Sequence, residues 1–582
     1  MLCAGPQRGS HSSHLIPISI LFINNLRCET GVGFLPRFPF LVQYLPIDSS
    51  LPLPHSGNFT VLQCARLPRM KKSCDFPRVQ PLMSTFHLTR RQVVRGAAAL
   101  AASSVLPGLG SLRCALAAPP SAGKNPQPKP TGPLTEASLT VTSTAVGFIG
   151  PAFAGFSYEK RALCEPLFTG SNNDLIGLFR RLGPSVLRLG GNTVERCVWT
   201  PNGPGQTQGQ IAPSDVDALA AFVKATGWQC LYGVNLEGAA TGATTPALAA
   251  AEVAYAAKQL GSSLLGIEIG NECDLYRRHK ADGDKWTFPQ FLTVWEEFRK
   301  AILATTPDVA ITGPASAGNV EDWTIPFGEK VTKKEITLLT QHYYRGNGQL
   351  PTSTAEFLIS SDPRLVHELA ELKAAAETIG VPYRMAECNS FSHGGSNGIS
   401  DSYTSSLWVL DYLFDCAQGG ACGVNFHGGG NGGGYTAIAD DHGRVVEARP
   451  EYYGILLFTL AGQGALYATQ LSAGSLNATA YAVKSASDGL SLVVVNKDLT
   501  QNLDLTAHLP HRAKSATLLA MTQLSPGATG PDLHAHAGVT IQGAGVSPDG
   551  AFSPSPAYSL KPHGSELKCY VPALSSALIQ IA

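Results

Sequence analysis

Short apolar runs alternate with longer helix-like runs across residues 148–460 of this chain. Eight short apolar runs turn polar at their C-terminal ends, which indicates buried strands. Regular alternation of strands and helices favours a parallel sheet, and eight such units in about 300 residues fit a (β/α)8 barrel. The predicted strands are 153–159, 185–191, 230–237, 264–272, 309–316, 336–344, 383–387 and 422–427. Helical patterns lie between them, for instance at 215–226, 245–260, 288–305, 364–379 and 402–418.

The helical pattern stops near residue 460. Short alternating segments bounded by Gly, Pro and Asn then predict an antiparallel β-sandwich domain over 461–582. The strand predicted at 138–147 precedes the first barrel strand, and we expect it to pair into that sandwich. The predicted fold class is therefore α/β, a (β/α)8 TIM barrel over 148–460 plus an antiparallel β-sandwich.

The N-terminal region differs in composition from the rest. Residues 1–82 are rich in Pro, Ser and His without periodicity, and we expect a disordered extension that precedes the true start at Met83. Residues 83–117 contain Arg90-Arg91, an uncharged apolar run and Ala115-Leu116-Ala117, and resemble a twin-arginine export signal. Residues 118–137 read as a Pro-rich linker. These features predict an exported protein, periplasmic or extracellular.

The composition limits the kinds of partner that can be expected for this chain. The 582 residues are 44% hydrophobic and 15% charged, which is enough for a large core and too long for one ordinary domain. Lys plus Arg equals Asp plus Glu, at 43 each, so no charge excess favours nucleic acid or a membrane surface.

The cysteines have no zinc-like spacing, and we expect no metal and no cofactor. Cys273 and Cys388 directly follow two glutamates, and we expect buried thiols there. Cys416 and Cys422 are close enough in sequence for a disulfide in an oxidising compartment, which leaves that pairing open.

Two of the predicted strands lead into a glutamate. Residues 264–272 form an apolar run that ends in Asn271-Glu272, and residues 383–387 end in Glu387 before a polar, Gly-rich segment. A barrel carries its chemistry at the C-terminal strand ends. Two carboxyl groups facing each other there can serve as the acid and the nucleophile of glycoside hydrolysis. His342 and Tyr344 alternate to one face of their strand and are expected to orient Glu387.

Several runs together resemble glycoside hydrolase family 79, which contains β-glucuronidases and heparanases. The resemblance covers residues 138–582 and implies a retaining hydrolase with Glu272 as acid/base and Glu387 as nucleophile. The runs are Phe-Ala-Gly-Phe-Ser-Tyr-Glu (153–159), Arg-Leu-Gly-Gly-Asn (188–192), Ile-Gly-Asn-Glu (269–272), Gln-His-Tyr-Tyr (341–344) and Ala-Glu-Cys-Asn-Ser (386–390).

The resemblance also implies sugar-binding residues. Glu159 and Asn192 match positions that hold ring hydroxyls, and Asn271 matches the position that contacts the 2-hydroxyl. A uronic acid carboxylate needs donors, and the loops Gly394-Gly395 and 428–435 offer backbone amides, with His393 and Tyr435 beside them. Family glucuronidases commonly carry tyrosine where this chain has Ser392.

The sequence therefore predicts an exo-acting retaining β-glycosidase, a β-glucuronidase, whose partner is a carbohydrate containing glucuronic acid. Three alternatives remain open: a β-glycosidase for a neutral sugar of the glucosidase or xylosidase type, an endo-acting heparanase-like hydrolase, and a carbohydrate-binding relic of the barrel. Such a relic would be expected to lack one carboxylate, and this chain has both.

Overall fold

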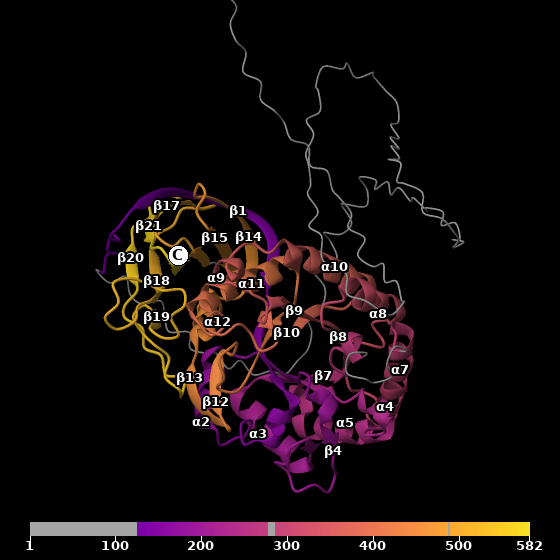
Figure 1. Ribbon diagram of the computed structural model, residues 1–582. Coiled ribbons are helices and arrows are strands. Elements are labelled where there is room, and N and C mark those ends of the chain that lie inside the picture. The colour runs from indigo at the N-terminus through magenta and orange to yellow at the C-terminus, as the bar shows by residue number, and fades with distance from the viewer. Residues whose placement is uncertain (1–124, 277–285, 487–488) are drawn as a thin grey trace, which may run out of the picture. The chain divides into compact units, whose positions relative to one another are not determined.

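The computed structural model describes residues 125–276, 286–486 and 489–582 (Figure 1). All of them fall in the second of the two units into which the chain divides, Leu109–Ala582. The predicted extension 1–82, the predicted signal 83–117 and the first residues of the predicted linker lie outside the described residues.

Eight parallel strands close into a barrel, in the order β10-β11-β2-β3-β6-β7-β8-β9. Each predicted barrel strand is confirmed within a few residues at its N-terminal end. The strands are β2 (Ala154–Glu159), β3 (Val186–Gly190), β6 (Gln229–Val234), β7 (Leu264–Ile269), β8 (Ile311–Ser316), β9 (Leu338–Asn347), β10 (Tyr383–Ser392) and β11 (Val424–Gly428).

Helices follow the barrel strands, and their ends are written in the sequence. Thr245 and Asp362 accept hydrogen bonds from the third residue of α5 and of α10, at 3.1 Å each, and a proline opens both helices. The α-helices are α2 (Asn173–Arg181), α3 (Pro213–Thr226), α4 (Gly238–Thr241), α5 (Pro246–Leu260), α7 (Phe288–Thr305), α8 (Ile325–Lys330), α9 (Ala355–Leu358), α10 (Pro363–Ile379), α11 (Tyr403–Gly419) and α12 (Pro450–Ala461).

Short helices and two-stranded sheets lie in the connections between strands and helices. They are η1 (Lys160–Cys164), η2 (Val194–Arg196), η3 (Gly261–Ser263), η4 (Cys273–Leu275), η6 (Val320–Thr324), the pair β4 (Val198–Trp199) and β5 (Gln210–Ile211), and the pair β12 (Ile438–Asp441) and β13 (Arg444–Ala448).

A second sheet of ten strands has the order β19-β18-β22-β16-β15-β14-β1-β17-β21, with β20 beside β18. Its strands are β1 (Leu134–Ile149), β14 (Gly464–Ser472), β15 (Ala478–Ser485), β16 (Leu490–Asn496), β17 (Asn502–His508), β18 (Ala516–Gln523), β19 (Val539–Ile541), β20 (Tyr558–Leu560), β21 (Glu566–Val571) and β22 (Ser575–Ile581).

This topology corrects two predictions. The strand expected at 138–147 begins at Leu134, inside the predicted linker, because residues 134–140 pair in parallel with residues 502–508 of β17. The sheet is also not wholly antiparallel: β1 pairs antiparallel with β14 but parallel with β17. Hydrogen bonds join the ten strands into one sheet.

Helices α11 and α12 connect the two sheets. Tyr403 donates to the carbonyl of Leu574 at 2.9 Å, and Phe414 stacks on Tyr481 at a ring distance of 4.2 Å. These helices are buried on nearly all sides, so the β-rich sheet shares a core with the barrel.

The eight cysteines in the described residues are free, so Cys416 and Cys422 do not pair there. Cys273 and Cys388 are buried thiols, as expected. Among the described segments, no helix is both long and apolar enough to cross a bilayer.

Candidate active site

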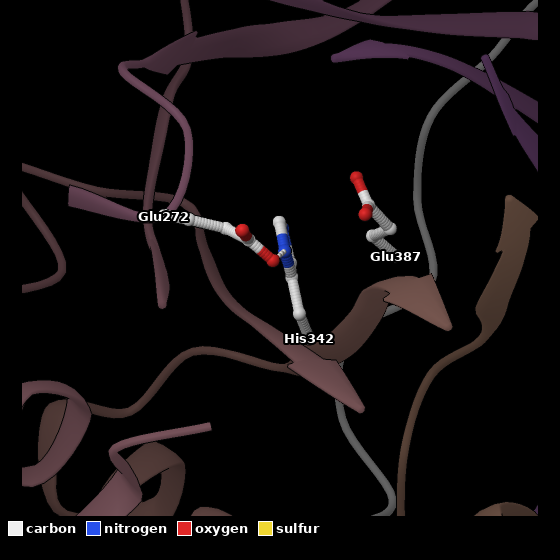
Figure 2. A group of neighbouring side chains, drawn as sticks. All are labelled: Glu272, His342 and Glu387. Atoms are coloured by element: carbon white, nitrogen blue, oxygen red, sulfur yellow. Dashed lines mark hydrogen bonds and ion pairs between the residues drawn. The ribbon is translucent and has the colours of Figure 1, made fainter. Parts of the chain in front are cut away.

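Glu272 and Glu387 come together from β7 and β10, with His342 of β9 between them (Figure 2). An oxygen of each glutamate and a ring nitrogen of His342 lie within 4.8 Å of one another. Glu272 lies in the turn after β7, whereas Glu387 lies inside β10. The predicted end of that strand at Glu387 is wrong, because β10 stays paired with β9 as far as Ser392.

Each glutamate has its own partner on β9. The hydroxyl of Tyr344 donates to Oε1 of Glu387 at 2.8 Å, and Nδ1 of His342 lies 3.1 Å from Oε1 of Glu272. The expectation that both β9 side chains orient Glu387 is therefore corrected for His342, whose hydrogen bond goes to Glu272.

Arg188 of β3 is the centre of the polar network, and its role was not predicted from the sequence. Its fully buried guanidinium donates to Oε2 of Glu387 at 2.7 Å, to Oε2 of Glu268 at 2.7 Å and to Oδ1 of Asn271 at 2.9 Å. It also contacts Nε2 of His342 at 3.1 Å. A lone arginine inside an apolar strand was the available signal, because a buried charge requires partners.

The two glycines after Arg188 make room for this network. A Cβ at Gly190 would lie 2.2 Å from the Arg188 guanidinium carbon, and a Cβ at Gly191 would lie 2.6 Å from a carboxylate oxygen of Glu159. Gly191 also has a φ of 71°, which glycine adopts without strain. The Gly-Gly pair is thus required by the side chains it faces.

The arginine also fixes the proton on His342. A guanidinium has no acceptor, so Nε2 of His342 must accept from Arg188. A neutral imidazole then carries its hydrogen on Nδ1 and donates it to Oε1 of Glu272. When Glu272 is protonated, its hydrogen therefore belongs on Oε2, the oxygen that His342 does not contact.

Glu387 lies in surroundings that favour its charge. Burial raises the pKa of Glu387, but the charges of His427 and Arg188 and the hydrogen bond from Tyr344 outweigh burial and hold that pKa well below its ordinary range. Burial, followed by the charge of Glu387, raises the pKa of Tyr344, which remains a donor. Glu387 is thus an ionised carboxylate at neutral pH.

A second cluster joins Glu387 to Glu159. Nδ1 of His427 lies 3.0 Å from the hydroxyl of Ser157 and 3.6 Å from Glu387, and its Nε2 lies 3.7 Å from Glu159. Burial lowers the pKa of His427, but the two carboxylates outweigh it and raise the pKa above the ordinary value. Glu159 also accepts from the backbone N–H and hydroxyl of Thr193, at 2.7 and 2.6 Å.

Asn271 is 2% exposed. Arg188 holds its Oδ1, and Nδ2 has no hydrogen-bond partner among the described residues. Glu272 beside it has a φ of 49°, a left-handed conformation that costs a non-glycine residue about 1–3 kcal/mol. Such a turn persists only where its surroundings fix it, and a free buried amide N–H is suited to a substrate hydroxyl.

The loops that were expected to bind a carboxylate contact each other. The backbone N–H of Tyr435 donates to the carbonyl of Gly394 at 3.1 Å, and the N–H of Gly395 donates to Ser392 at 3.4 Å. Gly429 and Gly430 donate to Thr436 and Asp440. The prediction that these amides are free donors is therefore wrong at the positions that donate within the loops.

Of the remaining predicted residues, Tyr435 lies next to the glutamate pair, whereas His393 and Asn192 are exposed. The Tyr435 hydroxyl lies 3.5 Å from that of Tyr344, which places it beside Glu387. His393 is exposed and contacts Ser392 at 3.0 Å. Asn192 lies in the turn after β3, is exposed, and joins no hydrogen bond of the cluster in the part of the chain that the structure describes.

The atoms of Glu272, His342 and Glu387 are close enough to hold a divalent cation. Arg188, however, donates to Nε2 of His342 and to Glu387, and His427 lies beside Glu387. A metal ion there would face these positive groups at close range. The arrangement is therefore better suited to two carboxyl groups in unlike surroundings than to a metal.

No family model matches the chain. A β-glucuronidase of Aspergillus niger is 26% identical over 330 residues, which are 51% of this chain and 60% of that protein. A β-glucuronidase of Neurospora crassa is 24% identical over 342 residues, 52% of this chain and 59% of that protein. The chain thus spans about three fifths of the length of these curated relatives.

Solved structures share the fold. A 4-O-α-L-rhamnosyl-β-D-glucuronidase of Fusarium oxysporum has a TM-score of 0.63 at 18% identity, covering 76% of this chain and 99% of that chain. A GH51 arabinofuranosidase of Xanthomonas axonopodis has a TM-score of 0.56 at 14% identity, covering 77% and 100%. The likeness shows a parallel barrel of the kind found in glycoside hydrolases.

Proposed function

We propose that this chain is an exo-acting retaining β-glycosidase of family 79 that cleaves β-glucuronides. The observation that carries the proposal is the pairing of Glu272 and Glu387 within 4.8 Å of each other in unlike surroundings. Retaining enzymes keep their carboxyl groups about 5–5.5 Å apart, whereas inverting enzymes leave about 6.5–9.5 Å for a water.

Glu387 acts as the nucleophile. Arg188 and Tyr344 hold its two oxygens and favour its ionised form, so a lone pair is available to attack the sugar carbon. The attack forms a glycosyl ester on Glu387 and breaks the bond to the leaving oxygen.

Glu272 acts as the acid in that step. Its proton on Oε2 passes to the leaving oxygen, and the ionised form that results accepts the Nδ1–H of His342. Glu272 then takes a proton from water, which attacks the ester and releases the sugar with its configuration kept. The free Nδ2 of Asn271 donates to the 2-hydroxyl, a contact that strengthens in the transition state.

The glucuronide rests on the names of both curated relatives and of the first structural neighbour. Tyr435 beside the nucleophile supplies a hydroxyl donor for a sugar carboxylate. The neutral-sugar alternative has one observation in its favour, since several loop amides expected to bind a carboxylate donate elsewhere. Export directed by residues 83–117 remains part of the proposal.

Two measurements test the proposal. We expect 4-nitrophenyl β-glucuronide to be cleaved with a higher kcat/KM than 4-nitrophenyl β-glucoside, and NMR of the first product to show the β-anomer. An α-anomer as the first product would refute the retaining mechanism. A glucoside preference would remove the uronic acid and leave the hydrolase.

A further inference from the structure

Glu195 lies in η2, the turn that follows β3, and its carboxylate binds two other segments. Oε1 accepts from the backbone N–H of Asn271 at 2.8 Å and from the hydroxyl of Tyr276. Oε2 accepts from the backbone N–H groups of Leu236 and Glu237, at 2.9 and 2.8 Å. One side chain therefore joins the C-terminal ends of β3, β6 and β7.

All four contacts are donated to Glu195. An ionised carboxylate offers about four acceptor positions and no donor, which matches this set. A protonated carboxyl or an amide at this position would point a hydrogen-bond donor at a backbone N–H, which is itself a donor. The site is therefore built for a carboxylate, and a neutral substitute of the same shape cannot satisfy it.

The segment held by Glu195 is the turn that carries Glu272. Asn271 is fixed at its backbone N–H by Glu195 and at its side chain by Arg188. The backbone N–H of Glu272 donates to the carbonyl of Ala315 at 2.9 Å. These contacts enforce the left-handed φ of 49° at Glu272, which aims its carboxyl at His342 and toward Glu387 (Figure 2).

We infer that Glu195 is a positioning residue that sets the reach of the Glu272 carboxyl toward the leaving oxygen. This inference rests on the proposed role of Glu272 as acid/base. Glu195 touches none of the reacting atoms, and no contact to Glu387 is recorded for it among the described residues. Its loss should therefore impair proton donation more than nucleophilic attack.

The test is the leaving-group dependence of Glu195→Gln. Aryl β-glucuronides whose phenols span a range of acidity are compared with the unaltered protein. We expect kcat/KM to fall about 10- to 100-fold for a weakly acidic phenol that needs a proton, and less than about 3-fold for 2,4-dinitrophenol, which leaves without one. Tyr276→Phe, which removes one of the four donors, should show the same trend more weakly.

Asp215→Asn is the matched control. Asp215 is also a buried carboxylate that accepts two backbone N–H groups, those of Gln206 and Ala212, at 2.8 and 2.9 Å. It contacts neither glutamate of the pair. We expect this variant to lose stability but to keep the leaving-group dependence of the unaltered protein.

The outcomes distinguish a failure of the positioning role of Glu195 from a failure of the acid/base role of Glu272. Glu272→Ala is expected to show a steep dependence on the leaving group. Given that dependence, the positioning role would be overturned if Glu195→Gln and Tyr276→Phe lose the same activity on all substrates, or lose none. If Glu272→Ala itself shows none, the acid/base role fails and the positioning role fails with it. Should Glu195→Gln not fold, Tyr276→Phe decides alone.

Discussion

Glu272 and Glu387 are the same residue type at the mouth of one barrel, yet the chain supports them in opposite ways. Glu387 lies inside a paired strand, with Arg188 and Tyr344 on its oxygens and His427 nearby. Glu272 lies in a strained turn with one neutral imidazole on one oxygen. The position beside Arg188 and His427 favours the anion at Glu387, whereas the proposed role of Glu272 requires a group that exchanges a proton.

The largest expected effect is on the anion. Glu387→Gln removes the attacking carboxylate while preserving its shape, so kcat/KM on an aryl β-glucuronide should fall by about 10⁴-fold or more. Circular dichroism checks that the variant folds. Residual activity within about 10-fold of the unaltered protein would show that another group is the nucleophile.

Removing Arg188 tests whether a neighbouring cation keeps Glu387 ionised. Arg188→Met leaves Glu268 and Glu387 buried without their partner, and breaking a buried pair in this way costs about 3–5 kcal/mol. Urea denaturation measures this loss. The low pKa of Glu387 should also rise, which moves the acid limb of the kcat/KM profile to higher pH in any folded fraction.

Arg384→Met is the control for that experiment. Arg384 is equally buried in β10, but its guanidinium donates to Asn425 and to backbone carbonyls, and no ion pair is recorded for it in the described chain. It should lose stability without moving the acid limb. Equal shifts of the acid limb in both variants would show that the effect is not the charge beside Glu387.

Glu451 of α12 shows what burial does without a cation. It is 1% exposed, and one of its oxygens has no hydrogen-bond partner among the described residues. Burial raises its pKa to about 8, opposed by the hydrogen bond with Asn389. The folded state then binds a proton that the unfolded chain releases near its ordinary pKa. Stability should therefore fall as pH rises from about 4.5 to about 8 and level off above, by up to about 5 kcal/mol.

Glu451→Gln should remove that slope. The variant should be about as stable as the unaltered protein near pH 5 and more stable at pH 9, measured by urea midpoints across the range. A parallel pH dependence in both proteins would show that Glu451 is ionised in the fold and that burial alone does not set its charge.

The smallest effect concerns the sugar. Tyr435→Phe removes the hydroxyl next to Tyr344 and should lower kcat/KM on the glucuronide a few-fold more than on the glucoside. His393→Ala, at an exposed position, should change the ratio less. A larger change for His393 would move the carboxylate site onto the loop and away from Tyr435.

The barrel strands could be predicted because each is a continuous apolar run, and the helices because Pro, Thr or Asp opens them. The rest depends on contacts between distant segments. Arg188 reads as one charge in an apolar strand, while its partners come from β7, β9 and β10. Strand β10 continues past Glu387 because it stays paired with β9. Asn389, which reads as a loop residue, lies in this strand, and its side chain donates to the carbonyl of His427.

The prediction of free amide donors in the two loops was wrong for the same reason, contacts between distant segments. Gly394 and Tyr435 are far apart in the sequence, and only the fold shows that the N–H of one loop is taken by the carbonyl of the other. Glycine in a loop indicates exposed backbone, but it does not indicate which donors are free.

Azide trapping tests the central claim, the division of roles between the two glutamates, most directly. In Glu272→Ala, azide needs no general base and can attack the ester on Glu387 in place of water, so the rate should recover and the product should be the β-glycosyl azide. In Glu387→Ala, azide replaces the nucleophile and should give the α-glycosyl azide. The reverse pairing of products, or no rescue of either variant, would contradict the account.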